Sequence, residues 1–169
     1  MQNSDAQNQN AQIKEHQSPI WVTRPDDAAL RAANVNLKTG LATDFLNLFN
    51  EYIMLGELVC DGSLERAVLN DWVPIDYETH FAQSGFAQAQ TVLAAYRSLD
   101  PASRQSFEKE VGTLISLILT HQESNPCPKE LLGEIKHQRD FVAALISEPA
   151  PANVCEVEDA QSAIDALFA

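Results

Sequence analysis

The stretch from Leu41 to Val59 constrains the fold of this chain more than any other segment. Its apolar residues recur at spacings of three and four, the period of an α-helix with one apolar side; they are Leu41, Phe45, Leu48, Tyr52, Leu55 and Val59. A polar stripe follows another side at the same spacing and consists of Asp44, Asn47, Glu51 and Met54. We therefore expect one unbroken helix over 41–59, with Thr39 as its N-cap.

Helical signals recur along the rest of the 169-residue chain. Aspartates suited to the N-cap position precede three further segments; they are Asp26, Asp76 and Asp100. Periodicity also predicts helices over 63–72, 86–99 and 129–147, the last with its apolar side formed by Leu131, Ile135, Val142 and Leu145. Glycine is scarce and no segment alternates as a strand would. The sequence predicts an all-α fold, a single-domain helical bundle of three to four long helices with short helical connectors.

Composition divides the chain into four parts. Residues 1–18 are rich in Gln, Asn and Ser, and a segment this polar cannot bury enough surface to offset its ordering entropy, so we expect a disordered N-terminal arm. Residues 19–147 form the expected helical bundle domain. A Pro/Ala linker is expected over 148–153, followed by an acidic amphipathic helix over 154–169.

The net charge of −13 is concentrated in the middle of the chain, because residues 40–96 hold eight acids against Arg66 alone. Such a field repels phosphate backbones and disfavours direct nucleic-acid binding. It suits a basic protein partner, and it also suits mimicry of nucleic acid. Solubility alone is a third explanation.

The cysteines are three in number and widely spaced, at Cys60, Cys127 and Cys155. They form no Cys-x-x-Cys pair, so the sequence predicts reduced thiols rather than a structural zinc site or a disulfide framework. No charged leader followed by an apolar run begins the sequence, and no apolar run is long enough for a bilayer. We expect a soluble cytoplasmic protein that does not bind membranes.

An aromatic connector follows the central helix and is too apolar to be a solvated loop. We expect it to fold over the polar stripe, so that a candidate interaction or ligand-binding site comprises Asp44, Asn47, Asn50, Glu51, Trp72, Tyr77, His80 and Phe81. The stripe is open to three interpretations: a solvated edge, a structural network, or a ligand site. Carboxylates near His80 should raise its pKa.

The remaining histidines give weaker signals. Glu134 and His137 form a single Glu-x-x-His motif, whereas di-iron bundles need two such motifs and further carboxylates; we therefore predict no metal and no cofactor. His121 ends an apolar stripe and is expected to act at a helix C-terminus, where the dipole favours it. No phosphate loop, nucleophile elbow or Cys–His pair at a familiar spacing is found, and we assign no catalytic residue.

The C-terminal helix carries an apolar stripe that suits docking into a partner's groove, although the same stripe could pack on its own bundle; it includes Val157, Ile164, Leu167 and Phe168. The sequence favours a non-enzymatic interaction or regulatory protein, an adaptor for a basic or amphipathic protein surface. One alternative is a small helical enzyme or ligand-binding protein with a site around Asn47, Glu51, Tyr77 and His80. A second alternative is an acidic decoy of a nucleic-acid-binding protein.

Overall fold

The computed structural model describes residues 23–148, and these residues are helical with no β-strand; they show one isolated bridge, between Val35 and Ala42. The α-helices are α1 (Asp27–Ala32), α2 (Asn47–Cys60), α3 (Tyr77–Gln83), α4 (Ala89–Arg97), α5 (Pro101–Glu123) and α6 (Lys129–Ser147). Two 3₁₀ helices, η1 (Thr43–Leu46) and η2 (Arg66–Asp71), complete the described elements. The predicted all-α helical fold is confirmed.

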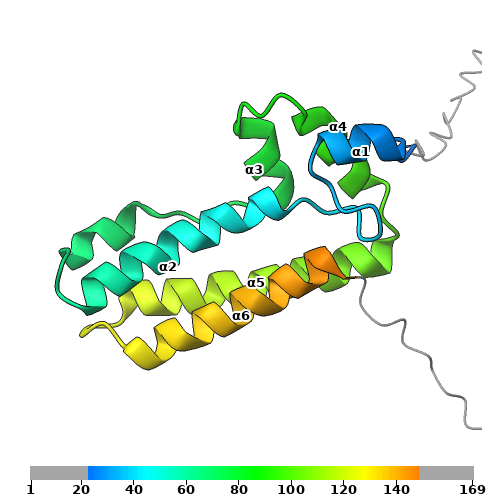
Figure 1. Cartoon of the computed structure of the whole chain (residues 1–169). Helices are drawn as coiled ribbons and strands as arrows, with labels where there is room; N and C mark the ends of the chain where they lie inside the picture. The colour runs from blue at the N-terminus through cyan, green and yellow to red at the C-terminus, as the bar shows by residue number, and fades with distance from the viewer. Residues whose placement is uncertain (1–22, 149–169) are drawn as a thin grey trace, which may run out of the picture.

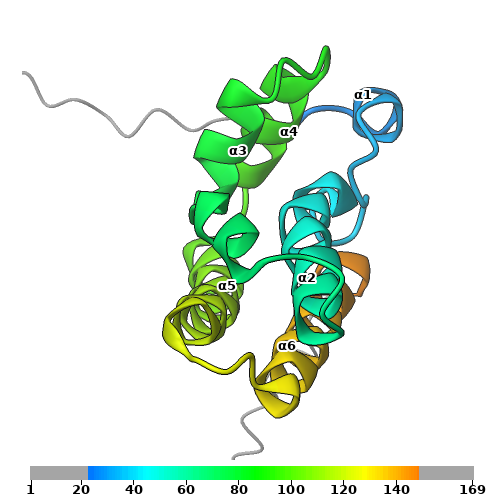
Figure 2. The same cartoon turned by 90° about the vertical axis from the view of Figure 1, so that its left-hand side faces the viewer.

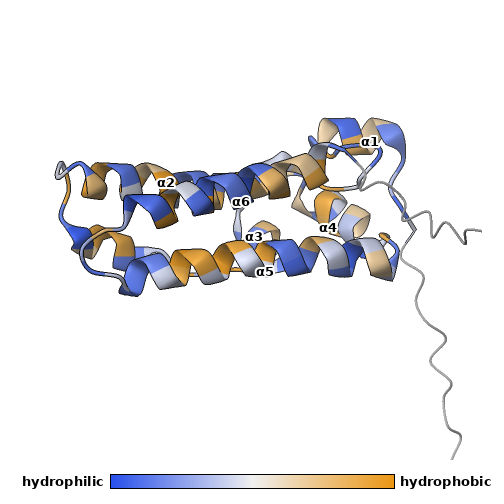
Figure 3. Ribbon diagram, turned by 90° about the horizontal axis from the view of Figure 1, so that it is seen from below, coloured by the Kyte–Doolittle hydropathy of each residue, from blue (hydrophilic) through white to orange (hydrophobic). Residues whose placement is uncertain are grey.

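The three longest helices lie side by side, as Figure 1 shows, with α2 and α5 running in one direction and α6 returning in the other. Viewed from the end in Figure 2, α2, α5 and α6 occupy three corners, and η2 with its flanking loops crosses from α2 towards α5. The short helices α1, α3 and α4 gather towards the end of the bundle where α5 begins and α6 ends, and there α4 packs against both α1 and α3. Each long helix carries hydrophilic and hydrophobic residues in alternating patches (Figure 3), as an amphipathic rod in a bundle should.

The aspartate caps are confirmed. Asp26 accepts a hydrogen bond from the backbone N–H of Ala29 at 2.8 Å. Asp76 does the same for Thr79 at 2.7 Å, and α3 begins at the next residue. Asp100 accepts from the N–H of Ser103 at 2.9 Å and precedes the proline that opens α5. These side chains satisfy N–H groups that a helix start otherwise leaves without partners.

The start of the central helix differs from the prediction of one rod over 41–59. Leu41 and Ala42 are extended, a 3₁₀ turn follows, and the α-helix begins only at Asn47. Thr39 is not an N-cap, because its hydroxyl donates to the carbonyl of Ile146 at 2.6 Å. That bond fastens the loop before η1 to the end of α6, so the tertiary contact outweighs the local helical signal.

Two shorter elements were also predicted too long. The segment expected as a helix over 63–72 is the 3₁₀ helix η2, which starts at Arg66. The helix expected over 86–99 is α4, which spans only nine residues. Neither element has a side chain that caps its first N–H groups, because Glu65 and Gln88 make no such hydrogen bond, and an uncapped helix start is less stable.

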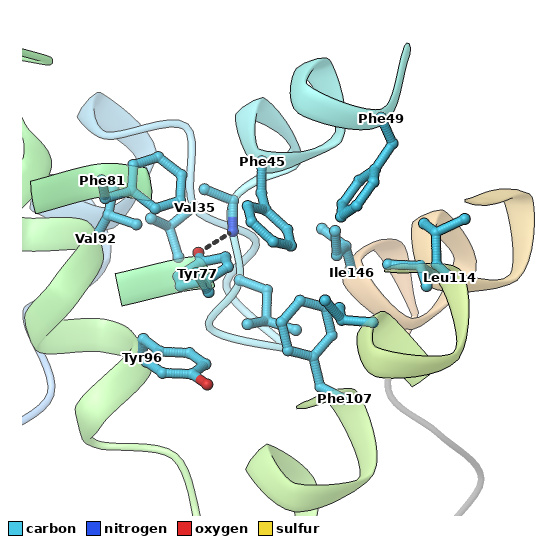
Figure 4. Packing of buried hydrophobic residues seen from close by; sticks show 14 of the residues in the cluster. Val35, Phe45, Phe49, Tyr77, Phe81, Val92, Tyr96, Phe107, Leu114 and Ile146 are labelled. Atoms are coloured by element: carbon cyan, nitrogen blue, oxygen red, sulfur yellow. Dashed lines mark hydrogen bonds between the residues drawn. The ribbon is translucent and has the colours of Figure 1, made fainter. Parts of the chain in front are cut away.

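The core is rich in aromatic rings and centres on Phe45, which is 0% exposed. Its ring contacts those of Phe49, Tyr77 and Phe107 edge to face or tilted, with centroids 5.1–6.1 Å apart. Figure 4 shows these rings converging from η1, α2, α3 and α5, with Ile146 of α6 beside them. Such packing makes one continuous core out of the long helices and the short ones.

The buried side of each helix is close to the predicted one but rotated. On α2 the buried residues are Phe49, Tyr52, Ile53 and Gly56, whereas the predicted seam residues Leu48, Leu55 and Val59 are only half-buried. On α6 the buried residues are Leu132, Ile135, Val142 and Ile146, so Leu131 and Leu145 of the predicted stripe lie beside the core.

Several predictions fall on residues that the structure does not describe. The N-terminal arm, most of the linker and the C-terminal helix with Val157, Ile164, Leu167 and Phe168 lie outside residues 23–148, so these boundaries stay predictions. Within the described residues, none of the helices has the length and hydropathy needed to cross a membrane.

Candidate functional site

The predicted polar stripe of α2 faces solvent. Asn47 and Glu51 are exposed, and Met54 is 54% exposed. Asp44 is half-buried and accepts a hydrogen bond from the side chain of Asn34 at 2.8 Å. The connector therefore does not fold over this stripe.

Asn50 has a structural contact instead. Its side-chain oxygen accepts a hydrogen bond from the guanidinium of Arg139, which reaches across from α6. Arg139 also lies 2.9 Å from the carboxylate of its neighbour Asp140. Asn50 thus helps to hold α2 against α6.

The aromatic residues of the connector are buried, so their rings serve the core. Trp72 donates its indole N–H to the carbonyl of Leu48 at 2.9 Å. Tyr77 accepts a hydrogen bond from the N–H of Ala42 at 2.8 Å (Figure 4), and burial raises the pKa of its hydroxyl. Phe81 is 1% exposed. These contacts fasten the connector onto α2 and η1.

His80 is half-buried between the rings of Phe45 and Phe81, with ring centroids at 5.4 and 5.0 Å. Burial lowers its pKa, and the opposing effect of Asp44 is smaller. The expectation that carboxylates raise the pKa of His80 is therefore wrong. Desolvation by the aromatic rings outweighs the nearby negative charge.

Glu51 and Tyr77 line different hollows of the surface. Glu51 lines a hollow of about 210 Å³ between α2 and the chain from η2 to α3. We call this the acid-rimmed hollow; it is lined by Leu48, Glu51, Leu55, Val68, Asp71, Trp72, Val73 and Ile75. Tyr77 lines a larger cleft of about 650 Å³ between the start of α3 and α5.

The acid-rimmed hollow combines an apolar lining with negative charge. Leu48 and Leu55 are the half-buried seam residues of α2, and Val73 opposite them is 62% exposed. Glu51 and Asp71 are both exposed and have no salt-bridge partner among residues 23–148. An apolar patch with carboxylates at its edge is a surface that a basic amphipathic segment can cover.

The larger cleft has polar groups that already bind one another. The hydroxyl of Tyr96 donates to Glu108 at 2.6 Å, and Arg104 lies 3.9 Å from the same carboxylate. At its edge Arg97 pairs with Glu78 at 2.7 Å. Because these side chains already bind one another, the cleft has few free polar groups with which to hold a ligand, despite its volume.

The end of the bundle where α2 and α5 finish, which we call its far end, holds a cluster that the sequence did not predict. Cys60, the last residue of α2, forms a disulfide with Cys127 in the turn between α5 and α6, 67 residues later. The prediction of reduced thiols is thus wrong for this pair. Cysteine spacing could not reveal it, because the partners become neighbours only when α2 lies beside the α5–α6 turn.

His121 lies against this disulfide and is 0% exposed. Its Nε2 is 3.3 Å from the Sγ of Cys127, and its Nδ1 is 2.8 Å from the hydroxyl of Tyr52. His121 does lie in the last turn of α5, as predicted, but its side chain points into the bundle and its ring nitrogens face Tyr52 and Cys127. Burial, with a contribution from Arg66, lowers the pKa of His121 and keeps the imidazole neutral. Burial also raises the pKa of Tyr52 to about 12.

Arg66 closes the cluster from η2. Its guanidinium donates to the carbonyls of His121 and Gln122 at the end of α5. Both of these bonds come from Nη2, whereas Nη1 is buried and has no hydrogen-bond partner within the described part of the chain. The only base of residues 40–96 is therefore directed at α5 and not at the acid-rimmed hollow.

Glu134 and His137 are both exposed on α6. The metal-type grouping found among residues 23–148 is a different one, Cys60, His121 and Cys127, whose potential ligand atoms all lie within 4.8 Å of one another. The sequence carried only an indirect signal for this grouping: Cys60 directly follows the predicted end of the central helix at Val59, whereas nothing in the spacing links it to Cys127 or His121.

Comparisons of the chain with protein-family models, with curated proteins and with solved structures find no match.

Proposed function

We propose that this protein is a non-enzymatic interaction or regulatory protein of the cytoplasm, an adaptor that binds a basic, amphipathic protein surface at the acid-rimmed hollow. The observation that carries the proposal is a single hollow that joins half-buried leucines and an exposed Val73 with two carboxylates that have no salt-bridge partner among residues 23–148. Apolar groups left on the surface favour burial by a partner, and the carboxylates favour a partner that brings positive charge.

Charge distribution supports this choice of partner. Residues 40–96 carry eight acids and one base, and that base is Arg66, which binds carbonyls of α5. No cation of this stretch thus offsets Glu51 or Asp71 at the hollow. Exposed ion pairs contribute only about 0.2–1 kcal/mol each, so the carboxylates would select a basic partner while the apolar contacts supply most of the affinity.

The two alternatives have less support. A ligand site around Asn47, Glu51, Tyr77 and His80 needs these groups to converge, whereas Glu51 and Tyr77 line separate hollows. The Tyr77 hydroxyl is also occupied by a backbone N–H. The nucleic-acid decoy stays a second alternative, and competition of DNA for the captured partner would favour it. The C-terminal helix stays a proposed second contact.

The test is affinity capture by the immobilised full chain, compared with two charge-reversal variants. Glu51→Lys with Asp71→Lys alters the hollow, and Glu130→Lys with Glu134→Lys makes the same charge change at exposed positions of α6. The hollow variant should bind the captured partner at least about fourfold more weakly, because attraction becomes repulsion at two pairs. The α6 variant should bind it like the wild type. Equal effects of the two variants, or an affinity that does not fall with added salt, would refute the proposal.

A further inference from the structure

The cluster at the far end of the bundle brings together two cysteines and one histidine, residue types whose side chains commonly bind metal ions in proteins. Cys60, Cys127 and His121 come from α2, the α5–α6 turn and α5, and their potential ligand atoms lie within 4.8 Å of one another. Thiolates and imidazole are the ligands that zinc and related thiophilic cations prefer. We propose that reduction of the Cys60–Cys127 bond turns this cluster into a binding site for a divalent cation of the zinc class.

The position of His121 fits a metal ligand. In a tetrahedral zinc site, bond lengths near 2.0 and 2.3 Å place a ligating nitrogen and sulfur about 3.5 Å apart. The Nε2 of His121 is 3.3 Å from the Sγ of Cys127, so a shift of a few tenths of an ångström suffices. The Cα atoms of the two cysteines are 5.5 Å apart, a separation from which both sulfurs can reach one ion.

Tyr52 orients the imidazole in the way that metal sites require. Its hydroxyl lies 2.8 Å from Nδ1 of His121 and 3.4 Å from the carbonyl of Ile118. It can therefore accept a hydrogen bond from Nδ1–H and donate one to that carbonyl. This arrangement leaves the lone pair of Nε2 directed at Cys127. A partner of this kind on the second ring nitrogen fixes the tautomer of a metal-binding histidine.

The surroundings hold the imidazole in place and leave a route to solvent. Gly56 lets α2 pack closely here, since a Cβ at this position would be 2.9 Å from a methyl group of Leu132 and 3.8 Å from His121 Cε1. Both cysteines are half-buried. Cys60 also lines an open hollow of about 530 Å³ between α2 and α6, through which an ion or a reductant can approach.

The chemistry balances with a thiol reductant of the glutathione class. Two such thiols reduce the Cys60–Cys127 bond to two protein thiols and are themselves oxidised to a disulfide. The cation then displaces both thiol protons to solvent, and two metal–sulfur bonds and one metal–nitrogen bond form. Three protein ligands leave the fourth position for water or an exchangeable ligand.

In the experiment the full chain is reduced with a phosphine, the reductant is removed under anaerobic conditions, and the protein is titrated with Co²⁺ as a spectroscopic probe. One Co²⁺ per chain should bind with a thiolate-to-cobalt charge-transfer band and tetrahedral d–d bands, two protons should be released, and Zn²⁺ should displace it. The oxidised chain, with every residue in place, should not bind. Cys155→Ser should bind like the wild type. Tyr52→Phe should bind about 10- to 100-fold more weakly, because the imidazole loses its orienting partner.

The proposal is overturned if the reduced chain keeps its helical circular dichroism and binds no Co²⁺, if the oxidised chain binds equally well, or if Cys155→Ser abolishes the bands. A reduced chain that loses helicity without metal and regains it with one Zn²⁺ supports the proposal, since binding then drives folding. A reduced chain that unfolds and does not respond to Zn²⁺ overturns it.

Discussion

Removal of the Cys60–Cys127 disulfide should destabilise the bundle more than any other single change at its far end. The bond closes a loop of 67 residues, and the loop-entropy relation gives a loss of about 4 kcal/mol at 25 °C when such a loop is opened. For the 126 residues from 23 to 148, this corresponds to a fall in the melting temperature of about 15 °C. The value is an upper limit, because the relation assumes that the unfolded chain has no residual structure.

The assay is urea unfolding of the Cys60→Ser/Cys127→Ser variant and of the wild type with and without reductant, all with a chelator present so that metal binding does not contribute. Cys155→Ser is the matched control and should unfold like the wild type. The double variant should not respond to reductant. A loss below about 1 kcal/mol in the double variant would refute the reasoning, because it would mean that the two sulfurs do not close this loop in the folded chain.

Three further changes test other parts of the fold. Phe45→Ala should cost about 3–5 kcal/mol in urea unfolding, because the ring is fully buried among aromatic neighbours, whereas Met54→Ala at an exposed position of α2 should cost less than about 0.5 kcal/mol. Asp76→Ala should lower the free energy of unfolding by about 1 kcal/mol through loss of the cap on α3. Its control is Asp140→Ala, at a solvent-exposed position in the middle of α6 where the side chain caps no helix end, and this change should cost less. Stability should fall as the pH drops below about 6.5, because burial lowers the folded-state pKa of His80 and His121 and the unfolded chain then binds more protons. His80→Gln should flatten this dependence, and an unchanged slope would contradict the desolvation of His80.

The sequence predicted the elements whose signals are local. Asp76 and Asp100 mark helix starts because a short polar side chain can bond to an N–H three residues later, whatever the rest of the chain does. On α5, Phe107, Val111, Leu114 and Ile118 recur at helical spacing and are all buried, so local periodicity identifies the core-facing side of this helix. The start of the central helix was not predicted correctly, because the bond from Thr39 to Ile146 joins positions 107 residues apart.

The candidate site was harder to predict for the same reason. Leu48 and Glu51 were assigned to different stripes of the central helix, yet they line one hollow, because residues three apart are neighbours on a helix and the rotation of α2 leaves Leu48 at the edge of the core. The Cys60, His121 and Cys127 cluster depends on how α2 lies beside the end of α5, and periodicity carries no information about that arrangement. Trp72 and Tyr77 were predicted as members of an interaction or ligand-binding site, whereas both are buried in the hydrophobic core.

Carboxylate footprinting of the protein with its captured partner tests the central claim most directly. A carbodiimide and an amine label exposed Asp and Glu side chains, and mass spectrometry measures the labelling of each one with and without the partner. Labelling of Glu51 and Asp71 should fall on binding, while that of Glu130 and Glu134 on α6 should stay unchanged. Protection of the α6 pair with no change at Glu51 and Asp71 would contradict binding at the acid-rimmed hollow.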